Sequence, residues 1–212
     1  MQERIQYTLH QAGENSSELK KVLDHYQNQP EKLKAARFLI ANIPAHRTYV
    51  GKEIDSLKQM KKESIQQGRI SDEIVTHWKS FDYSSSQVVK DIDVIKADIL
   101  IENIDLAFEA WEKRSWSKQY SFEDFCEYVL PYRIGDEPLE KWRRIYYERY
   151  SPVLDSLYQG NDVVEAARVM ANYLKEEGFT NHTDFNLPHL GALFLLENRV
   201  GYCRDNCDIA TY

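Results

Sequence analysis

Residues 199–212, with the sequence RVGYCRDNCDIATY, include the side chain best suited to nucleophilic chemistry. Gly201 allows a turn that brings Cys203 to the expected start of a helix. At such a position the unpaired amide groups and the positive end of the helix dipole favour a thiolate, which lowers the pKa of the cysteine and makes it a better nucleophile. Cys203 is therefore a candidate nucleophile, whereas Cys207, one turn further on, is better explained as a small buried side chain.

A metal site is the alternative use of the same cysteines. Cys203 and Cys207 would share a helix face, and His182 and His189 lie upstream. However, a Cys-x-x-x-Cys step on a helix is not the usual zinc knuckle, and the two histidines lie in a polar loop and beside a proline. We therefore predict neither a metal site nor a bound cofactor.

Aromatic residues are abundant, with 14 Tyr, 8 Phe and 4 Trp, and many lie between Phe108 and Tyr158. They could line a groove for a peptide or a sugar, but the core and half-exposed rim of a helical domain explain them more simply. Charged residues close to them in the sequence form either a buried ion-pair network or a substrate-binding rim, which the sequence does not separate. These charged residues are Arg133, Asp136, Glu137, Arg143 and Arg144.

Composition excludes several classes of protein. The chain has 212 residues, and its 27 Lys and Arg against 34 Asp and Glu give a net charge of -7, the wrong sign for a nucleic-acid partner. No window approaches the roughly 18 consecutive apolar residues of a transmembrane helix, and the first residues lack the apolar region of a signal peptide. Three cysteines are too few for a disulfide scaffold.

Helical spacing of apolar residues recurs along most of the chain, so the fold class is predicted to be mainly α. Helix starts are predicted by two capping boxes, at residues 15–18 and 121–124, and by Pro30. A helix with a solvated charged face is expected over 52–67, and the spacing of Val88 to Ile99 is also helical. Other helices are expected over 99–111, from 139 to a stop at Pro152, and from 163 to Gly178. Three more are expected to begin at 71, Ser121 and Pro188. No strong hairpin signal is present.

Two stretches resemble the transglutaminase-like superfamily of cysteine enzymes, in particular the exported or lipoprotein-type members found in gut Bacteroidales. The first runs from AFEAW at 107–111 through SFEDF at 121–125 to EYVLPYR at 127–133 and EPLEKWR at 137–143. The second is Gly201-Tyr202-Cys203, followed by Asp205 and Ala210, which is similar to the Gly-x-Cys at the start of the core helix of that superfamily.

The resemblance implies a helical N-terminal domain over 1–186, followed over 187–212 by the start of a papain-like α+β core that is incomplete at Tyr212. It implies that Cys203 is the nucleophile, that its backbone amide faces the developing oxyanion, and that a His and an Asp from later strands complete the site. The chain by itself is then expected to be inactive, as part of a cysteine hydrolase or transferase that acts on a protein, peptide or glycan. The alternative is a helical module that binds protein or glycan and has a degenerate site.

Two further expectations concern the surroundings of the protein. By resemblance alone, the parent protein is expected in the periplasm or at the cell surface. An incomplete core helix would also leave Leu193, Phe194, Ile209 and Tyr212 without cover, so we expect two copies to associate through this end.

Overall fold

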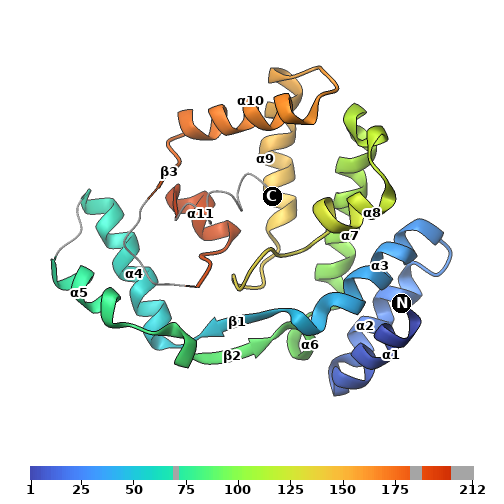
Figure 1. Cartoon of the computed structure of the whole chain (residues 1–212), viewed down its shortest axis with the longest axis horizontal. Helices are drawn as coiled ribbons and strands as arrows, with labels where there is room; N and C mark the ends of the chain where they lie inside the picture. Colours follow the sequence, from blue (N-terminus) through green and yellow to red (C-terminus); the bar gives the residue numbers. More distant parts are fainter. Residues whose placement is uncertain (69–71, 182–187, 202–212) are drawn as a thin grey trace. The chain divides into compact units, whose positions relative to one another are not determined.

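The computed structural model describes residues 1–68, 72–181 and 188–201, which are mostly helical, as the sequence predicts (Figure 1). The chain divides into two compact units. Unit 1 comprises residues 1–46, 90–134 and 141–169, and unit 2 comprises 47–89, 135–140 and 170–212. The expected division into a domain over 1–186 and a core that begins at 187 stays a prediction. None of the described helices is long and apolar enough to cross a membrane.

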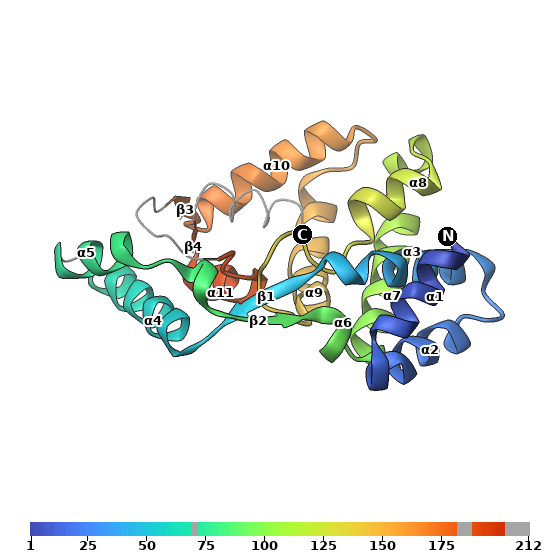
Figure 2. The same ribbon diagram turned by 60° about the horizontal axis from the view of Figure 1, so that its bottom comes forward.

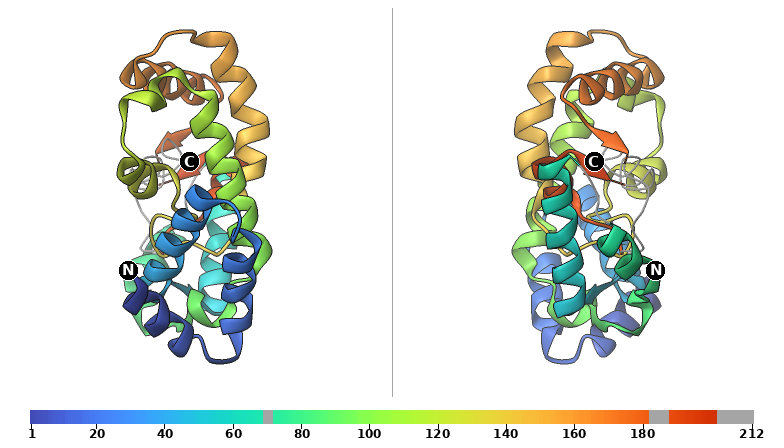
Figure 3. Two further views of the ribbon diagram at one scale, coloured as in Figure 1. Left: turned by 90° about the vertical axis from the view of Figure 1, so that its right-hand side faces the viewer. Right: turned by 90° about the vertical axis from the view of Figure 1, so that its left-hand side faces the viewer.

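Unit 1 is a set of packed helices around α7. Helices α1, α2 and α3 pack on one another, α7 contacts α2 and α3, and α9 packs along α7 (Figure 3). The fully buried side chains at their centre include Leu19, Ile40, Leu100 and Ile104. The helices of unit 1 are α1 (Gln2–Gln11), α2 (Ser16–His25), α3 (Pro30–Asn42), α6 (Asp91–Val94), α7 (Ala97–Lys113), α8 (Phe122–Asp124) and α9 (Trp142–Leu157).

The predicted capping box at the start of α2 is wrong in its contacts, although the helix does begin at Ser16. The Asn15 side chain does not cap α2. Its Nδ2 atom donates instead to the carbonyls of Ile92 and Ile95, at 3.1 and 3.0 Å. Glu18 accepts a hydrogen bond from the backbone amide of Ala97, the first residue of α7. Both side chains thus connect α2 to the distant α6 and α7, which local sequence rules do not foresee.

Helix α9 starts later and runs further than predicted. It begins at Trp142 and continues through Pro152 to Leu157. Contacts with the end of α7 hold this last turn, since Arg114 and Lys113 both pair with Asp155. Tertiary contacts therefore outweigh the tendency of proline to interrupt a helix. The capping box at Ser121, in contrast, is confirmed, because Ser121 and Asp124 each accept a hydrogen bond from the other's backbone amide.

Unit 2 combines short strands with helices. Strands β1 and β2 pair in a two-stranded sheet, and their arrows point in opposite directions in Figure 1. Figure 2 shows β2 running directly into α6. The second sheet pairs β3 and β4 in parallel, with Thr180 opposite Val200 and Asn181 opposite Gly201. The elements are β1 (Arg47–Val50), α4 (Lys52–Gln67), α5 (Asp72–Ser80), β2 (Gln87–Lys90), β3 (Thr180–Asn181), α11 (Ala192–Asn198) and β4 (Val200–Gly201); α10 (Val163–Glu176) begins in unit 1 and ends in unit 2.

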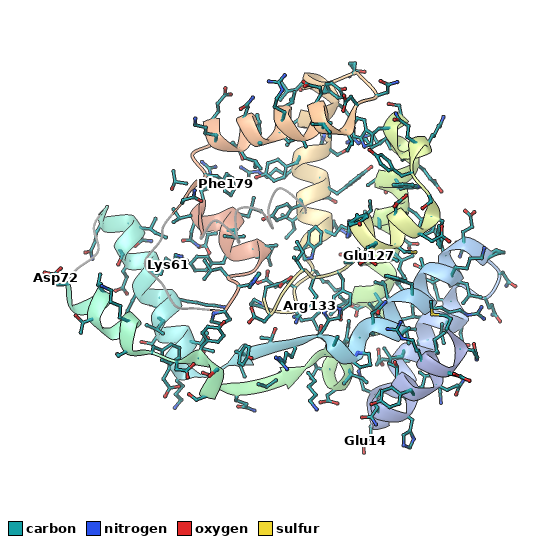
Figure 4. All side chains as sticks on the ribbon, viewed as in Figure 1. Glu14, Lys61, Asp72, Glu127, Arg133 and Phe179 are labelled. Atoms are coloured by element: carbon teal, nitrogen blue, oxygen red, sulfur yellow. The ribbon has the colours of Figure 1, made fainter. Side chains whose placement is uncertain are left out.

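Three helix predictions in this part of the chain need correction. The helical spacing that begins at Val88 is misleading, because residues 87–90 form β2, for which the adjacent β-branched Val88 and Val89 are suited. Helix α11 begins at Ala192 rather than Pro188, since Gly191 has a positive φ of 87° that ends the extended segment. The charged face of α4 is exposed as predicted, but its packed face is not wholly apolar, because Lys61 is fully buried on the same face as Leu57. Figure 4 labels Lys61.

Candidate functional site

The segment that leads to Cys203 leaves α11 by a sharp, well-defined turn. The helix is followed by Arg199, a non-glycine residue in the left-handed region with φ 55° and ψ 25°. Its amide donates to the carbonyl of Leu195 at 2.7 Å, and its Nη1 atom donates to the carbonyl of Glu177 at 2.7 Å. Left-handed conformation is uncommon for residues with a Cβ atom, so these contacts hold a turn that the chain does not favour by itself.

The chain then enters β4, which is buried. Val200 is 8% exposed, and Gly201 is also buried. The strand lies beside β3, and the amide of Thr180 donates to the carbonyl of Arg199 at 2.9 Å. The first residue of the Gly-x-Cys motif therefore lies in a strand fixed by backbone hydrogen bonds. Cys203 and Cys207 lie outside the described residues, as do Ile209 and Tyr212.

Two carboxylates of the loop 135–140 hold the segment that precedes α11. Asp136 Oδ1 accepts a hydrogen bond from the backbone amide of His189 at 2.8 Å. Glu140 Oε2 accepts one from the amide of Leu193, in the first turn of α11, at 3.0 Å. The loop is itself anchored, because the buried Glu137 accepts from the amide of Gly135 at 2.6 Å. We call Asp136 and Glu140 the carboxylate clip.

His189, a candidate metal ligand, packs against the same loop. A Cβ atom at Gly135 would lie 2.7 Å from the His189 ring, so only glycine leaves room for this contact. His182, its predicted companion, lies outside the described residues. Within residues 1–68, 72–181 and 188–201, no group of three or more His, Cys, Asp or Glu side chains is arranged to hold a metal ion.

The charged residues near the aromatic region separate into different environments. In unit 1, Arg133 forms an ion pair with Asp91, with 3.1 Å between Nε and Oδ2, and both side chains are only 1% exposed (Figure 4). The hydroxyl of Tyr132 donates to the same carboxylate oxygen at 2.8 Å. Arg144 is instead half-exposed and pairs with Glu102 on the surface. These residues therefore do not form one continuous substrate-binding rim within unit 1.

Arg143 occupies a third kind of environment. Its guanidinium donates to Asn103 Oδ1 at 2.7 Å and to the carbonyls of Val129 and Pro131 at 2.8 and 2.9 Å. It also lies over the Trp142 ring, 4.6 Å from the centroid. Burial lowers the pKa of Arg143 to about 9, which leaves the group charged at neutral pH. Arg143 closes the end of the π-helical turn Phe125–Val129, a structural function.

Several of the aromatic residues between Phe108 and Tyr158 are buried in the core of unit 1, and others are half-buried at its rim. Phe125 packs against Phe108 and Trp111, with ring centroids 4.8 and 5.2 Å apart, and Trp142 packs edge-on against Tyr146. Others remain on the surface, including Tyr120 and Tyr128, which are 44% and 71% exposed. Nearby Cys126 is buried, and burial, with a smaller contribution from Glu123, raises the pKa of its thiol to about 11. Cys126 is thus unsuited to nucleophilic chemistry.

Sequence reasoning missed Asp91 and Asn103, the partners of Arg133 and Arg143. Neither residue lies in a recognisable motif, and each is far from its arginine in the chain. A polar residue within an apolar helical stripe is the one available signal, since Asn103 directly precedes the buried Ile104.

Compared with models of protein families, with curated proteins and with solved structures, the chain gives no match.

Proposed function

We propose that this chain supplies the nucleophile of a transglutaminase-like thiol enzyme, and that Cys203 is that nucleophile. The observation that carries the proposal is the Gly-x-Cys motif, which follows α11 and begins with Gly201 at the end of β4. Gly201 lies in a buried, hydrogen-bonded strand, so the chain enters the motif from a fixed position. A nucleophile needs such a rigid support, because small displacements of the reacting atom cost large factors in rate.

The chemistry that the resemblance implies is acyl transfer through a thioester. The Cys203 thiolate attacks the carbonyl carbon of an amide, and the oxyanion of the tetrahedral intermediate accepts hydrogen bonds from backbone amides. A histidine gives a proton to the departing amine as the C–N bond breaks. Water or a second amine then attacks the thioester, which releases the acid or a new amide together with the thiol. In the superfamily that histidine and its aspartate follow the cysteine in the chain, so His189 is not proposed for this role.

Labelling of the three cysteines tests the proposal. The protein is treated with iodoacetamide at neutral pH, and the modified peptides are quantified by mass spectrometry. We expect Cys203 to react faster than Cys207, because the resemblance implies a helix start at Cys203, where a thiolate is favoured over an ordinary thiol. Cys126 is the internal control for a buried thiol of raised pKa. Equal reactivity of Cys203 and Cys207 would contradict an activated nucleophile.

Binding without catalysis is the second candidate function, and the exposed Tyr120 and Tyr128 favour it. Tyr120 precedes the short helix α8, and Tyr128 lies in the π-helical turn that follows it. Exposed tyrosines are common where proteins bind peptides or sugars. Glycan or peptide arrays screened with the wild type and with Tyr128→Ala test it. A ligand that the wild type binds and the variant loses would support binding through this surface.

A further inference from the structure

The carboxylate clip joins a loop to a segment far away in the sequence. Asp136 and Glu140 are four residues apart, and the two amides that they accept from, His189 and Leu193, are also four residues apart. The loop and the start of α11 therefore run alongside each other and are joined at both ends. Both contacts lie within unit 2.

The space between the two contacts is filled. A Cβ atom at Gly191 would lie 3.0 Å from Pro138 Cδ and 3.1 Å from Glu140 Oε2, and the residue has a positive φ. No larger side chain fits there without displacing the loop. The start of α11 is thus held against the loop by packing as well as by hydrogen bonds, and hydrogen bonds to a charged carboxylate are roughly twice as strong as neutral ones.

The opposite end of α11 carries the turn that leads to Cys203. The helix has seven residues and a length of about 10 Å at 1.5 Å per residue. Its C-cap residue, Arg199, is hydrogen-bonded to Glu177 and Thr180. A short helix moves as one body. Displacement of its first turn would therefore move Arg199 and β4, and with them the point at which the chain enters the Gly-x-Cys motif.

We propose that Asp136 and Glu140 are positioning residues for Cys203, acting through α11 and β4. The inference rests on the proposed function, because it says that these two carboxylates influence the reactivity of Cys203 as a nucleophile. Neither carboxylate takes part in the chemistry. Their effect is to keep the start of α11, and so the peptide groups that precede Cys203, in one arrangement.

The test measures the pH dependence of Cys203 alkylation by iodoacetamide in the full chain, read from the peptide that contains Cys203. The main variant is Glu140→Ala, and Glu140→Gln is the conservative one because its amide oxygen can still accept from Leu193. The matched control is Glu176→Ala, which removes an exposed carboxylate of α10. Hydrogen exchange of the Leu193 amide reports separately on whether the clip has opened.

In Glu140→Ala we expect the titration midpoint of Cys203 to rise towards the roughly 8.5 of a free cysteine, and alkylation at neutral pH to slow at least about threefold. The Leu193 amide should exchange faster, while Glu140→Gln and Glu176→Ala stay near the wild type. If Glu140→Ala fails to fold, Asp136→Ala makes the same test at the His189 contact.

Two outcomes overturn the inference in distinguishable ways. In the first, the titration midpoint of Cys203 is lowered in the wild type and stays the same in a folded Glu140→Ala, although the Leu193 amide exchanges faster. This result removes the positioning role and leaves the proposed function standing. A wild-type midpoint equal to that of a free cysteine refutes the proposed function, and the positioning role with it.

Discussion

Arg133→Met tests how much the buried ion pair with Asp91 contributes to folding. The two side chains are each 1% exposed, and Nε lies 3.1 Å from the carboxylate, which also accepts from Tyr132. Removing one partner of a buried pair costs about 3–5 kcal/mol, because the other charge stays in an apolar interior. For a chain of 212 residues, at about 2–4 °C per kcal/mol, the melting temperature should fall by about 6–20 °C.

Thermal unfolding followed by circular dichroism measures the loss, and Lys141→Met is the matched control. Lys141 pairs with Asp98, but the two side chains are 45% and 65% exposed, and such surface pairs contribute at most about 1 kcal/mol. The double variant Asp91→Asn/Arg133→Met should recover part of the loss, since neither charge then stays buried. If Arg133→Met is no less stable than Lys141→Met, the reasoning about burial of this pair is wrong.

Three further predictions concern single sites. Cys126 should resist iodoacetamide at neutral pH in the native protein and react after unfolding, because the pKa of its thiol is raised to about 11; rapid native labelling would contradict this. Gly135→Ala should lower stability by about 1–3 kcal/mol in urea unfolding, since its new Cβ atom meets the His189 ring, and His189→Ala should relieve the loss. Hydrogen bonding to Lys113 lowers the pKa of Asp155 in the folded protein. The charged Asp155 therefore stabilises the fold at pH values above the pKa of an ordinary aspartate, and this stabilisation disappears as the pH falls through the lowered pKa. Asp155→Asn should therefore flatten the loss of stability in acid, and an unchanged acid limb of the unfolding profile would count against this.

Local signals in the sequence foresaw much of the helical structure. Pro30 opens α3, the Ser121 capping box starts α8, and Gly178, with a φ of 95°, follows the end of α10. In each case the residues that decide the conformation are neighbours in the chain. The mainly α fold follows from such signals and from the spacing of apolar residues.

Long-range contacts explain what the sequence did not foresee. Asn15 has the side chain of a helix cap, yet its amide group bonds carbonyls some 80 residues away because α6 lies beside it. Strands β1 and β2 pair although no hairpin turn joins them, because α4 and α5 lie between them in the sequence. A pattern limited to a few neighbouring residues contains no information about such partners.

The candidate site, like the fold, could be predicted where it depends on neighbouring residues and not where it depends on distant ones. The motif around Cys203 is a local pattern and could be read directly. The turn expected at Gly201 was misplaced, because the left-handed residue is Arg199 and Gly201 lies in β4. The clip formed by Asp136 and Glu140 could not, because both amides that it holds belong to a segment about 50 residues further along. In the sequence, Asp136 stands out only as a charged residue near the aromatic region.

The central claim is tested most directly by the pKa of the Cys203 thiol in the protein that the complete reading frame encodes. Its alkylation rate is followed over about pH 5 to pH 10, with Cys203→Ala as the control. The account predicts a midpoint well below the roughly 8.5 of a free cysteine, followed by turnover of amide or glutamine substrates that Cys203→Ala abolishes. An unshifted or unreactive thiol would contradict an enzymatic role for Cys203 and favour a protein that binds without catalysis.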